Sequence, residues 1–161
     1  MGRLGAAAIA YARRGLYVFP LRPGGKEPLA AAAPHGVKDA SCDPDEVAAW
    51  WEIYPDANIG LATGQKSGVL VLDVDGPEGE ASLAALVAAN TPLPDTPQQI
   101  TGKGRHLFFA WPDGQHIGNS SRKLGPGLDI RGEGGYVLVA PSIHPNGSEY
   151  RWVRASGGAS A

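Results

Sequence analysis

The chain has 161 residues, of which 43% are hydrophobic and 19% charged, and its formal net charge is −2. This length and composition predict one globular domain with a substantial core, and the charge excludes a protein that is basic throughout, so any nucleic-acid surface must be a local patch. The single cysteine, Cys42, excludes an internal disulfide and a zinc site. We therefore expect a cytoplasmic protein, and no membrane partner, because no apolar run approaches the roughly 20 residues of a membrane span.

Helix and strand signals alternate in the first part of the chain. The predicted elements are a helix at 4–14, a strand at 16–20, a helix at 44–54 and a strand at 58–64. Asp43 and Pro44 supply the N-cap and the first position of the second helix. The intervening loop carries Lys26, which is a candidate phosphate contact because loops at strand ends often carry binding groups. A solvated loop lysine is the alternative.

The rest of the chain is rich in strand signals. The predicted elements are strands at 68–75, 98–101, 105–111, 128–132, 136–140 and 149–153, and a helix at 77–90. A tight glycine-containing connection joins the strands at 58–64 and 68–75, so we expect a hairpin there. Residues 112–126 are polar and glycine-rich and predict a loop. We expect one domain over residues 1–154, and a flexible tail or linker start over 155–161.

Two aspartates stand at the end of an aliphatic strand. Asp73 and Asp75 follow the run Val69–Leu72, and alternate residues of a strand share a face about 6.6 Å apart. Neighbouring like charges raise each other's cost of ionisation unless a cation lies between them. The pattern therefore favours a divalent metal site. The alternative is a solvated pair of acids just past the strand end, with Asp75-Gly76 in an ordinary turn.

Two further groups of polar residues follow in later strands. Lys103, Arg105 and His106 stand at the beginning of one strand, and Asp129 lies between two aliphatic residues of another, with Arg131 on the same face. A simple salt bridge between Asp129 and Arg131 is the alternative to a functional role for either residue.

Together with the aspartate pair, these residues provide three carboxylates and a basic cluster. Three carboxylates can bind two Mg²⁺ or Mn²⁺ ions, which prefer oxygen ligands and stabilise the attacking and leaving oxygens of phosphoryl transfer. Residues 103–131 contain five Lys or Arg against two Asp. Such a patch is suited to holding a triphosphate.

Three ordered motifs resemble a known family. They are Asp-x-Asp at 73–75, Gly-x-Gly-Arg-His-Leu-x-Phe at 102–109, and Leu-Asp-Ile-Arg-Gly-x-Gly-Gly-Tyr-Val followed by Pro-Ser-x-His at 128–144. In this order they resemble the bifunctional primase-polymerase (prim-pol) domain of the archaeo-eukaryotic primase superfamily. The Gly-Lys-x-Pro loop at 25–28 and residues 58–64 resemble its N-terminal half, so the resemblance covers nearly the whole chain.

The resemblance implies a fold and roles for individual residues. The implied fold is α/β (α+β), with an RNA-recognition-motif-like antiparallel catalytic sheet packed against an N-terminal αβ module. Asp73, Asp75 and Asp129 match the metal ligands of a two-metal site for Mg²⁺ or Mn²⁺. His106 matches a histidine that contacts the phosphates of the incoming nucleotide.

Several neighbouring residues are assigned by their closeness to these motifs. Arg105 and Lys103 are expected to assist His106, and Arg131 and His144 are candidates for nucleotide or template contact. A loop histidine bonded to backbone is the alternative for His144. The family often has Ser or Thr where Gly104 stands, so a hydroxyl contact to phosphate is replaced by backbone N–H or is missing.

The resemblance implies a template-dependent DNA primase/polymerase that transfers nucleotides from dNTPs or NTPs during replication of a phage, plasmid or integrated element. Its partners would be a single-stranded DNA template, a primer, and a helicase domain or protein beyond the C-terminus. Two alternatives stay open. One is a catalytically weak single-stranded DNA or origin-binding module, and the other is an Asp-x-Asp nucleotide-sugar transferase, which leaves His106 and Asp129 without a role.

Overall fold

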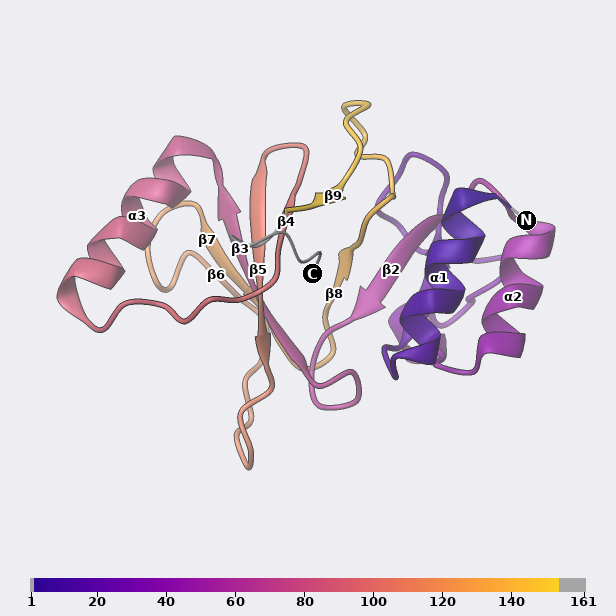
Figure 1. Cartoon of the computed structure of the whole chain (residues 1–161), viewed down its shortest axis with the longest axis horizontal. Coiled ribbons are helices and arrows are strands. Elements are labelled where there is room, and N and C mark those ends of the chain that lie inside the picture. The colour runs from indigo at the N-terminus through magenta and orange to yellow at the C-terminus, as the bar shows by residue number, and fades with distance from the viewer. Residues whose placement is uncertain (1, 154–161) are drawn as a thin grey trace.

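The computed structural model describes residues 2–153, which combine three α-helices with two antiparallel sheets (Figure 1). The helices are α1 (Arg3–Arg13), α2 (Pro44–Ile53) and α3 (Gly76–Ala89), with a 3-10 helix, η1, at Gly36–Asp39. The strands are β1 (Val18–Leu21), β2 (Asn58–Ala62), β3 (Val69–Asp75), β4 (Gln98–Ile100), β5 (Gly104–Ala110), β6 (Ser120–Ser121), β7 (Leu128–Arg131), β8 (Tyr136–Leu138) and β9 (Arg151–Trp152). The predicted mixed α/β content is confirmed. The tail predicted over 155–161 lies outside the described residues.

The smaller sheet has the strand order β1-β2-β8, and α1 and α2 pack against it. Helix α2 begins where the sequence predicts, because the Asp43 carboxylate accepts a hydrogen bond from the Asp45 backbone N–H at 3.0 Å. Trp51 of α2 is fully buried and donates its indole N–H to the Ala57 carbonyl. It is therefore a core residue.

The larger sheet has the strand order β6-β7-β3-β5-β4-β9. The chain runs from β3 through α3 to β4, and β5 lies between these two strands, which makes a split β-α-β unit. Helix α3 covers one face, where Leu83 packs with buried leucine and valine side chains of β3, β5 and β7. Figure 1 shows α3 at one end of the molecule and α1 and α2 at the other, with both sheets between them.

The hairpin predicted for the strands at 58–64 and 68–75 is wrong. Strands β2 and β3 belong to different sheets, and only one isolated bridge, between Gly64 and Val69, connects the two segments. The physical reason is that β1 and β8 occupy both edges of β2, whose side chains are buried throughout. The loop predicted over 112–126 also needs a correction, because Ser120–Ser121 form the edge strand β6 beside β7.

The second face of the larger sheet changes character along β3. Val71 and Phe108 of this sheet join a core shared with α1, α2 and the smaller sheet. Two and four residues after Val71, the same face carries Asp73 and Asp75. The apolar part of the face anchors the two sheets to each other, and its polar part is left for the site described next.

None of the helices in the described part of the chain has the length and apolar character needed to span a membrane.

Candidate active site

A row of polar side chains crosses the larger sheet from strand to strand. Asp129 of β7 is directly opposite Asp73 of β3, Asp73 is opposite His106 of β5, and His106 is opposite Gln99 of β4. Directly paired residues project from the same face of a sheet. The pairing therefore gathers residues from four separate chain segments. Asp75, two positions after Asp73, extends the same face toward the end of β3.

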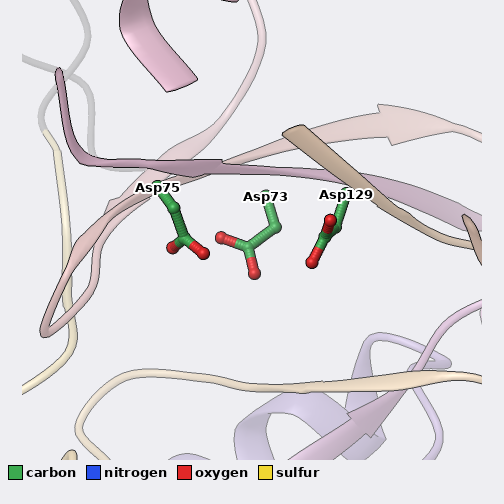
Figure 2. Close-up of side chains that lie close together, drawn as sticks. All are labelled: Asp73, Asp75 and Asp129. Carbon is green, nitrogen blue, oxygen red and sulfur yellow. The ribbon is translucent and has the colours of Figure 1, made fainter. Parts of the chain in front are cut away.

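The three aspartates form one acidic triad: Asp73, Asp75 and Asp129. Each offers one carboxylate oxygen such that these atoms lie within 4.8 Å of one another, and Figure 2 shows the side chains next to each other on one side of their strands. Burial, together with the charges of Asp73 and Asp129, raises the pKa of Asp75 above its usual value. Clustered carboxylate oxygens are the donor set that hard divalent cations prefer, and such a cation would relieve this repulsion. The triad therefore fits a divalent metal.

His106 lies beside the triad and is buried, with 6% of its surface exposed. Its Nε2 is 3.5 Å from a carboxylate oxygen of Asp73. Burial on its own would raise the pKa of Asp73, but the hydrogen bond with His106 and the nearby positive charges, including those of Arg131 and Lys26, lower it overall. Asp73 is thus held ionised although it is largely buried.

A pocket of about 270 Å³ opens beside these residues between the two sheets. Asp73, His106 and Arg131 line it from the larger sheet, and β8 lines the opposite side. Lys26 also lines the pocket, and its backbone carbonyl accepts a hydrogen bond from the Tyr136 hydroxyl at 2.9 Å. Two cations and an imidazole therefore face one cavity at the margin of the triad.

The salt bridge between Arg131 and Asp129, which was the alternative to a functional role for these residues, is present but loose. The closest nitrogen and oxygen are 3.8 Å apart, and about two-fifths of the Arg131 side chain is exposed. Asp129 also accepts a hydrogen bond from the Ser121 hydroxyl at 2.9 Å. The pair therefore leaves Arg131 accessible to a ligand in the pocket.

The structure does not bring Arg105 to the site. Arg105 is paired with Val74 in the sheet, so its side chain projects from the opposite face, where it makes two 2.8 Å hydrogen bonds to Glu80 of α3. Arg122 is likewise paired with Glu78 of α3. The local charge count over 103–131 missed these acids, because they come from an earlier segment that folds over the same sheet. The basic patch is therefore smaller than the sequence predicts.

Lys103 and His144 lie near Asp75. Lys103 is in the β4–β5 turn, and its charge acts on both Asp75 and His144. The His144 ring packs so closely against Gly102 that a side chain at position 102 would collide with it. Burial, and next the charge of Lys26, lower the pKa of His144.

The backbone-bonded alternative for His144 is confirmed in one respect. Its Nδ1 accepts a hydrogen bond from the Asn146 backbone N–H at 3.0 Å. This contact occupies one ring nitrogen only, so it is compatible with a ligand at Nε2.

Gly104 is directly opposite Asp75, and a side chain there would collide with the Val74 carbonyl. In this chain a hydroxyl-bearing residue is therefore excluded at that position, because the backbones of β3 and β5 approach too closely. The backbone N–H of Gly104 does not replace the hydroxyl contact to phosphate either, since it donates a hydrogen bond to the Thr101 hydroxyl at 3.0 Å.

The residues of the pocket or the row that sequence reasoning missed include Gln99, Asn119 and Tyr150. Tyr150 lines the pocket, and burial together with the charges of Asp73 and Asp75 raises its pKa to about 12, so its hydroxyl keeps its proton. Gln99 is the most buried of the three. The sequence does place Gln99 in a predicted strand. Which face of the sheet its side chain occupies depends on the pairing of that strand with His106, and the sequence does not give this pairing.

A family model described as bifunctional DNA primase/polymerase, N-terminal, matches residues 8–161. The chain belongs to this Prim-Pol family. The match contains the triad, His106 and both sheets, and it confirms the resemblance seen in the three motifs. No curated protein matches the chain. Membership of the Prim-Pol family implies nucleotidyltransferase-type activity on nucleotides and nucleic acid, in agreement with an acidic triad that can hold a metal ion.

Proposed function

We propose that residues 1–154 form a catalytic domain for template-dependent nucleotidyl transfer. The 3′-hydroxyl of a primer, or the hydroxyl of a first nucleotide, attacks the α-phosphate of an incoming dNTP or NTP. The hydroxyl loses its proton to solvent, a new oxygen–phosphorus bond forms, the bond between the α-phosphorus and the bridging oxygen breaks, and pyrophosphate leaves. This step needs little covalent help from a protein, so positioning and charge stabilisation supply most of the acceleration.

The observation that carries the proposal is the meeting of the acidic triad with His106 beside a cationic pocket, in a chain of the Prim-Pol family. Mg²⁺ or Mn²⁺ at Asp73, Asp75 and Asp129 would neutralise charge on the triphosphate and activate it toward attack. His106 lines the same pocket, and its Nε2 lies 3.5 Å from Asp73, so the ring is close enough to the triad to donate a hydrogen bond to a phosphate oxygen bound there. Arg131 and Lys26 provide positive charge on the pocket side, where the leaving pyrophosphate would be held.

The topology supports the finer fold assignment. The four central strands of the larger sheet have the order β7-β3-β5-β4, with α3 between β3 and β4. This is the arrangement expected of an RNA-recognition-motif-like catalytic sheet, and the smaller sheet with α1 and α2 corresponds to the expected N-terminal module. A cytoplasmic replication role, a single-stranded template with a primer, and a helicase beyond the C-terminus complete the proposal, and these rest on the family resemblance.

The test is a synthesis assay on a primed template and on an unprimed template, with Mg²⁺ or Mn²⁺ and with dNTPs or NTPs. Wild-type protein should form product only with a divalent metal. Asp129→Asn should lose more than about 100-fold of the activity, because even outer-shell changes at metal sites cost about 10- to 100-fold. Asp113→Asn is the matched control, since Asp113 is exposed and has no ion pair among residues 2–153.

Two results would decide against this function. Near-full activity of Asp129→Asn would show that the triad is not the metal site of the reaction. Salt-sensitive binding of single-stranded DNA by the wild type, without any metal-dependent synthesis, would favour the binding-module alternative.

A further inference from the structure

Gln99 is fully buried at the junction of the two sheets, and all of its side-chain polar atoms have partners. Its Nε2 is 2.6 Å from the Leu138 carbonyl and 3.0 Å from Nδ1 of His106. Its Oε1 accepts a hydrogen bond from the Ala140 backbone N–H at 3.1 Å. Gln99 therefore connects β4 to the β8 segment of the smaller sheet, and at the same time it contacts His106, its neighbour in the row of polar side chains.

The two backbone partners fix which end of the amide is which. A carbonyl oxygen only accepts and a backbone N–H only donates, so the NH₂ group must face Leu138 and the oxygen must face Ala140. One hydrogen of the NH₂ group is used by Leu138, and the other points at Nδ1 of His106. Nδ1 must then accept, because a proton on it would meet the amide hydrogen.

The neutral imidazole carries its proton on one nitrogen only. With Nδ1 accepting from Gln99, the proton of His106 is on Nε2, the nitrogen 3.5 Å from Asp73, and both residues line the pocket. The ring is thus presented as a hydrogen-bond donor toward the site. The position of the His106 ring is fixed relative to both sheets, because Gln99, which contacts the ring, is also hydrogen-bonded to β8.

We propose that Gln99 is a positioning residue, which holds His106 as the Nε2–H tautomer and fixes its ring against the smaller sheet so that Nε2–H is directed at the phosphates of the incoming nucleotide. The phosphate part of this assignment rests on the proposed function. The tautomer and the hydrogen bond do not, and they can be measured on the protein alone.

The first test uses nitrogen NMR of the histidine rings in ¹⁵N-labelled wild-type protein without metal, at mildly alkaline pH. Signals of the four histidines are assigned by the loss of one set in His106→Gln. We expect an unprotonated Nδ1 in His106 and a scalar coupling between Nδ1 and the Gln99 amide nitrogen. A proton on Nδ1 would overturn the proposal, and so would the lack of that coupling in a slowly exchanging Gln99 amide.

The second test separates positioning from packing. Gln99→Met keeps the length of the side chain and removes the donor, so KM for the nucleotide should rise about 10-fold, with a smaller change in kcat, as expected when an outer-shell partner is lost. Gln98→Met is the matched control: Gln98 is the adjacent residue, and its amide oxygen accepts from Arg105 on the opposite face. The ring signals of His144 report whether each variant is folded around the site. A folded Gln99→Met protein with the wild-type KM would overturn the positioning role.

If Gln99→Met does not fold, Gln99→Leu takes its place, because its branched apolar side chain also cannot donate a hydrogen bond to Nδ1. The expected rise in KM is the same, and an unchanged KM would again overturn the role. A wild-type protein that makes no product would defeat the proposed function but not the ring measurement, so the two failures are distinguishable.

Discussion

The two faces of the larger sheet are built from alternating residues of the same strands, yet one face forms a hydrophobic core and the other carries the candidate active site. Leu72 and Val74 of β3 point toward α3 and belong to an apolar cluster, whereas Asp73 and Asp75 point the other way and belong to the acidic triad. The apolar face gains stability from burial, while the acidic face keeps like charges together at a cost. The comparison teaches that packing on one face holds the register that concentrates charge on the other.

The largest effect is expected from a change on the acidic face. Asp73→Asn preserves the shape of the side chain and removes one ligand, so the affinity for Mn²⁺ should fall more than about 100-fold, above the 10- to 100-fold typical of outer-shell changes. Electron paramagnetic resonance of free Mn²⁺ measures the binding, and circular dichroism checks that the fold is kept. Binding as tight as in the wild type would place the metal elsewhere and remove the contrast between the faces.

The opposite result is expected on the apolar face. Leu83 of α3 is 6% exposed and packs in the cluster under the sheet, so Leu83→Ala should lower the free energy of unfolding by about 2–5 kcal/mol. Urea denaturation gives the stability. The folded protein should still bind Mn²⁺ like the wild type, and a parallel loss of Mn²⁺ affinity would show that the two faces are not separable.

Two arginines sharpen the comparison because they lie on different faces. Arg131→Ala should raise KM for the nucleotide by about 10-fold or more, since hydrogen bonds to charged groups contribute about 1.5–3 kcal/mol. Arg105→Ala should leave KM unchanged and cost only about 0.2–1 kcal/mol of stability, because its partner Glu80 is about half exposed. Steady-state kinetics and urea denaturation of both variants check this. Equal effects of the two substitutions on KM would show that Arg105 also contacts the nucleotide.

The smallest effect is expected from the pH dependence of stability without metal. The pKa of Asp75 is raised in the folded state by burial and by Asp73 and Asp129. A group with a raised pKa adds stability that is fully present below its unfolded pKa and is lost as the pH rises through its folded value. Asp75→Asn should therefore melt slightly higher than the wild type at neutral pH, and the difference should shrink on acidification. Thermal scans across pH with a chelator measure it, and a wild type that is more stable at neutral pH would contradict the repulsion.

Local signals predicted most elements but not how they pair. The N-cap of α2, the strand ending in Asp73-x-Asp75 and the helix after it all follow from residues close together in the chain. The predicted β2–β3 hairpin is wrong because β2 pairs with β1 along one edge and with β8 along the other. Short connections favour hairpins, but both edges of a buried strand are assigned by the whole sheet.

The candidate site shows the same division. The sequence, with its family resemblance, named the triad and His106, and strand alternation placed Arg131 on the face of Asp129. It also grouped Arg105 with His106 although adjacent strand residues point to opposite faces. Gln99 could not be identified, because its role depends on β4, β5 and β8 meeting at one point.

The sequence by itself determined which residues carry charge at strand ends and which alternate toward a core, because side-chain direction along a strand has a period of two residues. Only the tertiary structure decided that Asp129, Asp73, His106 and Gln99 stand in one row, because register between distant strands depends on packing across the whole sheet. It likewise decided that α3 supplies Glu78 and Glu80 to neutralise part of the basic patch, since electrostatic partners are set by distance in space and not along the chain.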